Sequence, residues 1–279
     1  MIDSHLSSEE HIGFIFWNIH NNLQNISRIV ELAATRNVYV IALSEVKNIP
    51  NELIRNTGYR KVDYINQKNS HDIQLLINKS GIAASNYSVE NARYNLIYLR
   101  NWDFILAIAH LNSERTPEAR QYRQADILNM LEAINRLESS AKCKNTMIIG
   151  DLNFGLFDEQ MLSFPGLNTR LFLSEMRMSS RIHENEKDCY YNPMLNLYCD
   201  NSNEHIAKGT YYYENALEKW CCYDHVLMKQ PLIKYFKKIE ILSCLSSEML
   251  VNNNKPIQTI SDHLPIYFEL DFKEESFYE

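Results

Sequence analysis

Asp151 and Asn153 follow a short apolar run, residues 147–149, from which Gly150 separates them. Such a run ending in glycine is typical of a buried strand that opens into a loop. If the backbone stays extended, alternation along the strand predicts that both side chains point to the same side. Open α/β sheets bind ligands beyond the carboxyl ends of their strands, so this pair is a candidate for catalysis. Ordinary turn chemistry is the alternative interpretation.

The same placement recurs along the chain. Polar residues stand at or beside the end of five further apolar runs: Asn18, Glu45, His110, Asp224 and the pair Asp262-His263. Each has a purely structural explanation when it is taken alone, as a turn residue, a helix N-terminal carboxylate or a hydrogen-bonded histidine. A hydrophobic core does not need six polar strand ends. Their repetition therefore indicates a site to which several strands contribute.

Apolar periodicity predicts the elements that must position these residues. Strands are expected at 12–19 and 38–43 with a helix at about 22–36 between them, and this order favours parallel pairing with a right-handed crossover. Short strand-like runs with only one short helical segment, near 51–56, predict an antiparallel section. These runs cover residues 59–65, 73–77, 87–89, 94–99 and 104–109.

The second half begins with Thr116-Pro117, a capping hydroxyl followed by proline, which predicts the start of a long amphipathic helix that ends near Ser139. A further helix is expected near 170–176. Strands are predicted at 209–213, 223–228, 239–242 and 266–272. With no internal repeat or linker, the chain is expected to form one domain over residues 1–279, with its core at about 12–272.

Composition excludes some classes of protein. The chain has 279 residues, of which 45% are hydrophobic and 23% charged, as in a globular protein. A net charge of −7 argues against a broad basic surface for nucleic acid, although metal-binding carboxylates would contribute to it. Without a signal sequence or a membrane-length apolar run, a cytoplasmic protein with reduced thiols is expected. Its six cysteines match no zinc-binding spacing.

Taken in order, these motifs resemble the endonuclease/exonuclease/phosphatase superfamily. Two of them, Gly150-Asp151-Leu152-Asn153 and Ser261-Asp262-His263-Leu264-Pro265, are specific to this superfamily. The other motifs are weak alone and support the resemblance because they occur in the same order as in the superfamily. The remaining matches are Trp17-Asn18-Ile19, Leu43-Ser44-Glu45, Ala109-His110-Leu111 and Tyr223-Asp224-His225-Val226-Leu227.

The resemblance implies a four-layer α/β sandwich of two stacked mixed β-sheets flanked by helices, and hydrolysis of phosphate esters with Mg²⁺ or Mn²⁺. Mg²⁺ takes oxygen ligands and needs only one or two carboxylates. The resemblance implies that Glu45 binds the metal, with Asn18 and Asp262 nearby, and that Asp151 activates the attacking water with the help of Asn153. It implies that His263 contacts the phosphate or transfers a proton, with Asp224 orienting its ring. It also implies that His110 contacts the phosphate or the leaving group.

For the substrate, a nuclease-type phosphodiesterase acting on DNA or RNA is the first interpretation. The segments 209–213 and 220–225 loosely resemble inositol 5-phosphatases, but His225 and Gly155 stand where that branch has arginine. A phosphomonoesterase or a lipid or inositol-phosphate phosphoesterase is therefore the alternative. An inactive binding module is disfavoured because Glu45, Asp151 and His263 are all present. Arg123 is interpreted as structural, and protein partners are not assigned.

Overall fold

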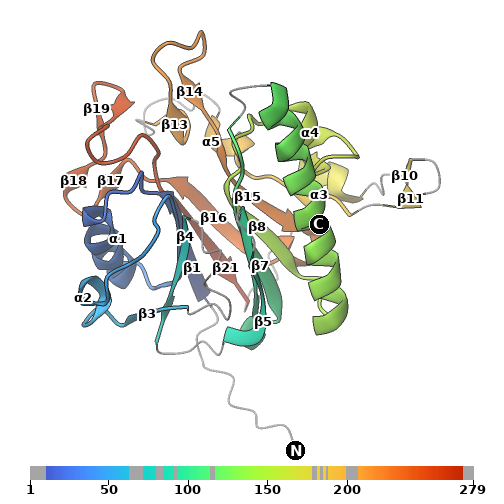
Figure 1. Ribbon diagram of the computed structural model, residues 1–279, viewed down its shortest axis with the longest axis horizontal. Coiled ribbons are helices and arrows are strands. Elements are labelled where there is room, and N and C mark those ends of the chain that lie inside the picture. Colours follow the sequence, from blue (N-terminus) through green and yellow to red (C-terminus); the bar gives the residue numbers. More distant parts are fainter. Residues whose placement is uncertain are drawn as a thin grey trace, which may run out of the picture.

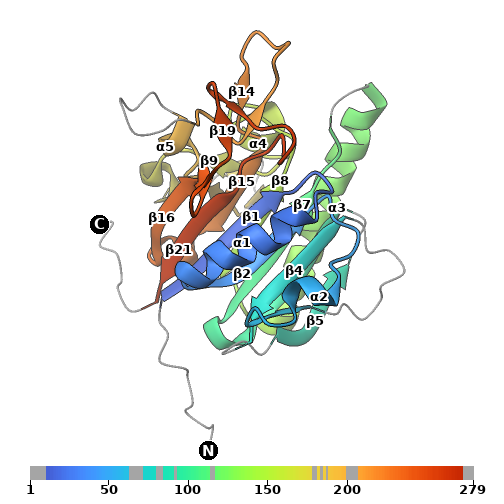
Figure 2. The same ribbon diagram turned by 90° about the vertical axis from the view of Figure 1, so that its left-hand side faces the viewer.

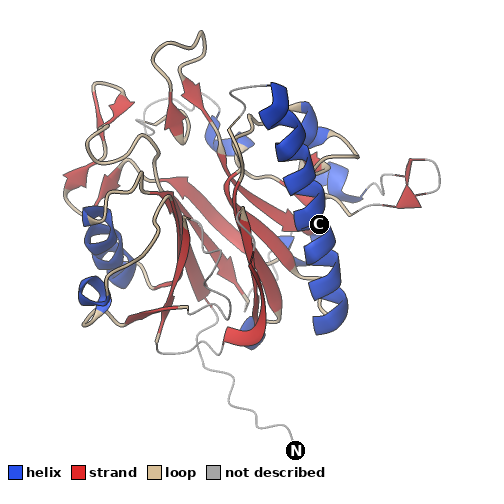
Figure 3. Cartoon of the chain, viewed as in Figure 1, coloured by secondary structure: helices blue, strands red, loops and turns tan. Residues whose placement is uncertain are grey.

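The computed structural model describes residues 11–62, 72–79, 84–90, 93–113, 117–177, 181–182, 185–186, 188–198 and 207–272. Two mixed β-sheets stack face to face, and helices cover their outer sides (Figures 1 and 3). This is the four-layer α/β sandwich that the sequence predicts.

The first sheet has a parallel pair at its centre. Its order is β16 (Phe236–Ile241), β21 (Ile266–Asp271), β1 (His11–Asn18), β2 (Val38–Ser44), β4 (Ile73–Asn78) and β3 (Tyr59–Lys61). β1 and β2 run parallel, as their β-α-β order predicts, and the other neighbours are antiparallel. The predicted strand at 59–65 is observed for residues 59–61, and residues 63–65 lie outside the described part of the chain.

The second sheet repeats this arrangement. Its order is β5 (Ala84–Glu90), β6 (Tyr94–Leu99), β7 (Phe104–His110), β8 (Thr146–Asp151), β15 (Asp224–Lys229), β12 (Tyr190–Tyr191) and β9 (Thr169–Arg170). β7 and β8 are parallel, and β15 is antiparallel to β8. The antiparallel section that short strands predict is confirmed by the pairings of β5, β6 and β7.

Alternation along the strands divides the core into three apolar layers. Phe14 and Phe16 of β1 point between the sheets, where they meet residues of β7, β8 and β15. Ile15 and Trp17 point outward against α1 (Gln24–Thr35), which lies across β1 and β2 in Figure 2. On the other outer side, α3 (Pro117–Ala141) covers the second sheet.

A buried ionic network joins α3 to the second sheet. Glu138 of α3 is 1% exposed, and its carboxylate accepts hydrogen bonds from Thr146 (2.5 Å), Lys229 (2.6 Å) and Lys144 (2.8 Å). Lys229 also contacts Asp188 at 2.5 Å. A buried carboxylate needs such partners because its desolvation is costly. The network therefore sets the position of α3 on the sheet.

Several short helices and two-stranded sheets lie outside the two main sheets. They are α2 (Asn51–Ile54), α4 (Glu159–Leu162), α5 (Leu195–Tyr198), α6 (Gln230–Ile233), the 3₁₀ turns η2 (Arg100–Trp102) and η3 (Leu173–Arg177), and the strand pairs β10 (Arg181–Ile182) with β11 (Asn185–Glu186), β13 (Tyr211–Tyr212) with β14 (Trp220–Cys221), β17 (Cys244–Leu245) with β18 (Glu248–Met249), and β19 (Val251–Asn252) with β20 (Lys255–Pro256). The predicted helix at 170–176 is wrong in type, because a strand ends at residue 170 and only η3 follows.

Within the described residues, no helix combines the length and apolar character that crossing a membrane requires. The five cysteines in this part of the chain are free thiols, and Cys143 and Cys222 are buried.

Candidate active site

Strand register brings the predicted polar residues to one edge of the sandwich. In the first sheet Asn18 is paired with Ser44, so Glu45 follows directly beside it. In the second sheet Asp151 is paired with both His110 and Asp224. Because both central pairs are parallel, their carboxyl ends face the same edge. The two sheets then meet at a contact between Asn18 and Asp151.

Asn18 links the two halves of the site. Its side-chain amide donates to Glu45 Oε1 at 3.0 Å and to Asp151 Oδ2 at 3.1 Å, and Asn18 is completely buried. Its side-chain oxygen Oδ1 accepts the backbone N–H of His20 at 3.1 Å. A carboxamide can donate two hydrogen bonds and still accept others. One side chain therefore sets the distance between the carboxylates of Glu45 and Asp151.

Asp224, His263 and Asp151 form a buried chain of ionisable groups. Asp224 Oδ2 lies 2.8 Å from His263 Nδ1, and His263 Nε2 lies 3.7 Å from Asp151 Oδ2. Burial alone would lower the pKa of His263, but the charges of Asp224 and Asp151 and the Asp224 hydrogen bond raise it to about 10. Burial, together with repulsion from the charge of Asp224, raises the pKa of Asp151 to about 7, while the charge of His263 and the hydrogen bonds from Asn18 and Asn153 oppose this shift. The raised pKa of His263 means that its imidazole ring is charged at neutral pH.

A prediction follows for the metal-free protein. Replacing Asp224 by asparagine should lower the pKa of His263 by at least about one unit, because it removes the partner that most strongly offsets burial. The imidazole should then lose its proton at a lower pH than in the wild type. Ring-nitrogen NMR shifts of His263, followed against pH, measure this. An unchanged titration of His263 would contradict the prediction.

His110 approaches the same group from β7. Its Nε2 atom lies 3.8 Å from Asp151 Oδ2 and 3.9 Å from Glu45 Oε1. Burial lowers the pKa of His110 and Arg93 lowers it further, while Glu45 and Asp72 oppose the shift. His110 is therefore neutral at neutral pH, and it can donate a hydrogen bond without supplying a proton.

The loop after β8 differs from its predicted form. Asn153 has φ +55°, so the backbone turns and does not stay extended as the sequence alone suggests. Its N–H donates to Asp151 Oδ1 at 3.1 Å, and its amide donates to the Leu111 carbonyl at 2.9 Å. Asn153 therefore holds the loop in shape around Asp151, and the extended backbone that would place both side chains on the same side is not observed. Asp151 makes a turn hydrogen bond through Oδ1, while its Oδ2 atom faces Asn18.

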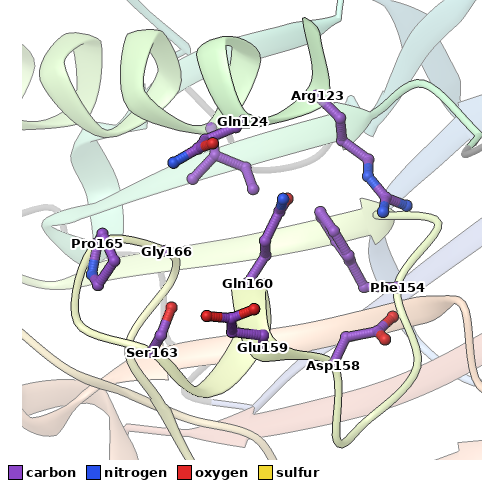
Figure 4. Close-up of a pocket in the computed structure, with 10 residues that line it drawn as sticks. Arg123, Gln124, Phe154, Asp158, Glu159, Gln160, Ser163, Pro165 and Gly166 are labelled. Atoms are coloured by element: carbon purple, nitrogen blue, oxygen red, sulfur yellow. The ribbon is translucent and has the colours of Figure 1, made fainter. Parts of the chain in front are cut away.

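Arg123 on α3 supports this loop, which agrees with its interpretation as structural. It is 3% exposed, donates to the Asn153 carbonyl at 2.5 Å, and lies 3.8 Å from the centre of the Phe154 ring. Figure 4 shows the guanidinium group beside that ring. His225 also supports this loop, because its Nε2 atom lies 2.8 Å from the Phe154 carbonyl oxygen and its ring is completely buried.

A cavity of about 210 Å³ lies on the α3 side of this loop. Arg123, Gln124 and Phe154 contribute to its wall, together with residues around α4, as Figure 4 shows. None of the polar strand-end residues lines it. The cavity is therefore distinct from the candidate active site, although Phe154 in its wall belongs to the loop that follows Asp151 and Asn153.

Arg123→Ala should destabilise the fold by about 2 kcal/mol or more, because it leaves a buried carbonyl without its charged donor and removes the contact with Phe154. Denaturant unfolding measures the change. Arg136→Ala on the exposed face of the same helix is the matched control and should change stability by less than about 0.5 kcal/mol. Equal effects of the two substitutions would contradict the assigned role of Arg123.

The structure adds four residues that were not predicted as part of the site. Ser261 Oγ donates to the Asn18 carbonyl at 2.8 Å and accepts the His263 N–H at 3.1 Å. Thr210 Oγ1 accepts the N–H of Asp224 at 3.1 Å. The Tyr211 ring lies 4.7 Å from the ring of His263. His20 lies close to Glu45 and Asp262. Ser261 and His20 stand inside or beside the recognised motifs, and Thr210 and Tyr211 lie in the segment 209–213 that loosely resembles inositol 5-phosphatases.

The donor atoms of this site fit a divalent cation. Asp262 Oδ1 is buried and has no hydrogen-bond partner among the described residues, and Glu45 lies close by on the other side of His20. A second group, Asp151, Asp224 and His263, has ligand atoms within 4.8 Å of one another. Its histidine is protonated and already bound to Asp224, so it offers no free lone pair. Glu45 and Asp262 are therefore the better candidates for holding a metal ion.

Comparison with known proteins gives one family match. Residues 15–263 match the model of the Endonuclease/Exonuclease/phosphatase family. A comparison with curated protein sequences gives no match.

Solved structures share the fold at low sequence identity. TDP2 from D. rerio, complexed with a single-strand DNA product, is 14% identical with a TM-score of 0.60, covering 94% of this chain and 100% of the other. Truncated Caenorhabditis elegans TDP2 is 15% identical with a TM-score of 0.57, covering 94% and 97%. The 3' phosphatase NExo from Neisseria, bound to a product DNA hairpin, is 13% identical with a TM-score of 0.57, covering 93% and 99%.

Proposed function

Because the chain belongs to the endonuclease/exonuclease/phosphatase family of metal-dependent phosphoesterases, we propose that it is a nuclease-type phosphodiesterase that hydrolyses DNA or RNA with Mg²⁺ or Mn²⁺. The observation that carries the proposal is the position of Asp151. This buried carboxylate lies between Asn18, which also holds Glu45, and the charged ring of His263.

Glu45 and Asp262 would hold the metal ion. Asn18, the third residue that the resemblance assigns to the metal, would support the site by fixing Glu45, since its amide donates to Glu45 Oε1 while its Oδ1 accepts the His20 N–H. A bound ion would polarise the phosphate and offset negative charge in the transition state. Oxygen ligands of this kind suit both Mg²⁺ and Mn²⁺.

Asp151 orients the attacking water and takes its proton as the water oxygen bonds to phosphorus. Its pKa of about 7 supports this role, since a general base works best when its pKa lies near the working pH. Asn153 keeps the loop that carries Asp151 in shape. The bond from phosphorus to the leaving oxygen then breaks, and water protonates that oxygen.

Two histidines stabilise the phosphate. The charged ring of His263, oriented by Asp224, donates from Nε2 to a non-bridging oxygen. Neutral His110 donates from Nε2 to a second oxygen, in keeping with the lowered pKa that leaves the ring uncharged. Charge stabilisation and positioning of this kind supply most of the catalysis in phosphoryl transfer.

Nucleic acid is favoured as the substrate by the structures of similar fold, which contain DNA products, and by aromatic side chains beside the site. The Tyr211 ring stacks on that of Tyr223 at 5.3 Å and lies against His263. Aromatic rings bind unpaired bases with little sequence preference. His225 supplies no cation for an inositol phosphate, because it is buried and bound to Asn192 and Phe154.

The test is a substrate panel with purified full-length protein. Single-stranded and duplex DNA, RNA, a 3'-phosphorylated oligonucleotide, an inositol polyphosphate and sphingomyelin would each be assayed with Mg²⁺, with Mn²⁺ and with a chelator. Metal-dependent release of nucleotides or oligonucleotides is the expected result. Turnover confined to the inositol phosphate, the lipid or the 3'-phosphate would overturn the assignment as a nuclease-type phosphodiesterase.

A further inference from the structure

His20 lies between the two carboxylates assigned to the metal. Its Nδ1 atom is 3.3 Å from Glu45 Oε2 and 3.5 Å from Asp262 Oδ1. Glu45 uses its other oxygen, Oε1, to accept from Asn18. The three atoms that face one another are thus one imidazole nitrogen and two carboxylate oxygens, and one of those oxygens, Asp262 Oδ1, is buried without a hydrogen-bond partner among the described residues.

The backbone holds His20 in this place. Its N–H donates to Asn18 Oδ1 at 3.1 Å, and the next N–H, that of Asn21, donates to the Glu45 carbonyl at 2.9 Å. His20, Asn21 and Glu45 have φ of +48°, +56° and +53°. Left-handed conformations are unfavourable for such residues and persist where the surrounding structure enforces them, often at functional sites. Both sides of the proposed metal position are built from this uncommon backbone.

The separations also fit ligands of a shared ion. Two ligand atoms at about 2.1 Å from one metal ion lie about 3.0 to 3.5 Å apart, depending on the angle between them. The two distances from His20 Nδ1 fall within this range. The His20 side chain is 58% exposed, so no protein group encloses the imidazole and prevents it from adjusting to an ion.

We propose that His20 is a metal ligand through Nδ1, and that it makes the site prefer a first-row transition-metal dication such as Mn²⁺ over Mg²⁺. Imidazole nitrogen binds transition metals well, whereas Mg²⁺ favours oxygen ligands. The inference rests on the proposed function in taking Glu45 and Asp262 as the metal ligands. It goes further by adding a nitrogen donor that the recognised motifs do not contain.

The first test is pulsed EPR of Mn²⁺ bound to the full chain, which detects nitrogen nuclei directly coordinated to the ion. Labelling all histidines with ¹⁵N should shift the coupling to the ¹⁵N frequencies, and His20→Gln should abolish it. His11→Gln is the matched control, since His11 also lies between two carboxylates, Glu269 (2.9 Å) and Asp271 (3.4 Å), at the opposite end of β1. This control should keep the coupling.

The second test compares affinities by calorimetry at one mildly alkaline pH. His20→Gln should weaken Mn²⁺ binding by at least about tenfold, the scale on which changes near a metal affect affinity, and weaken Mg²⁺ binding by less than about threefold. His11→Gln should leave both affinities unchanged.

The outcomes separate this inference from the proposed function. Bound Mn²⁺ without histidine coupling, or coupling that survives in His20→Gln, would mean that His20 only pairs with the carboxylates and would overturn the inference while the proposed function stands. Failure of the wild type both to bind Mn²⁺ and to cleave any nucleic acid would overturn the proposed function together with the inference.

Discussion

Asp151→Asn should lower kcat on a nucleic-acid substrate by a factor of about 100 to 10,000, the range that a positioned general base contributes. The amide keeps the size of the carboxylate, but its single oxygen can accept from only one of the two present donors, the Asn18 amide or the Asn153 N–H. It cannot take a proton from water. Metal affinity should therefore remain within a few fold of the wild type, because the ligands assigned to the ion are Glu45 and Asp262.

Steady-state kinetics with saturating metal measure this loss, and calorimetry measures the affinity. Asp103→Asn, an exposed aspartate at the opposite end of β7, is the matched control and should retain wild-type rates. If Asp151→Asn kept more than about a tenth of the wild-type kcat, another group would have to be the base. Comparable loss in both variants would indicate a general effect on folding.

Glu45→Gln should weaken Mg²⁺ and Mn²⁺ binding by about 10- to 100-fold, because it removes a charged ligand from the proposed metal site. Activity should fall at limiting metal and recover in part as the metal concentration rises. Unlike the loss in Asp151→Asn, this one should depend on metal concentration. Glutamine is as tolerant as glutamate of the left-handed φ of +53°, so backbone strain should stay the same.

Calorimetric titration of each metal and activity measured against metal concentration test this prediction. Glu132→Gln, on the exposed face of α3, is the control for loss of one acidic charge. Unchanged metal affinity in Glu45→Gln would place the ion elsewhere, with the Asp151, Asp224 and His263 group as the next candidate.

Much of the fold could be predicted because its long elements carry strong apolar periodicity. β1, α1, β2, β7 and α3 form where their patterns predict, and the β-α-β order correctly implies that β1 and β2 are parallel. The segment around η3 was less predictable. Its apolar residues pack against the central core from a strand end and one 3₁₀ turn, so tertiary contacts override a weak helical pattern.

The site was predictable to the extent that its residues stand at strand ends, which parallel pairing of β1 with β2 and of β7 with β8, and antiparallel pairing of β15 with β8 and of β21 with β1, bring together. Contacts made by loops were not predictable. The turn at Asn153 depends on a left-handed backbone, and His20 comes close to Asp262 only because Asn18 and Glu45 fix the segment from both sides. Neither relation appears in the periodicity of one strand. The role of His225 likewise depends on Phe154, 71 residues away in sequence.

The place of β1 in the first sheet has a consequence for how the protein matures during synthesis. β1 pairs on one side with β2, which follows soon after it, and on the other with β21, so that His11 is aligned with Asp271. On the ribosome, the strand that ends at Asn18 has one unpaired edge until residue 271 has emerged. Exposed strand edges invite pairing with other chains. Nascent-chain binding by chaperones should therefore persist until β21 is released, and catalytic competence should arise only after β21 has paired with β1.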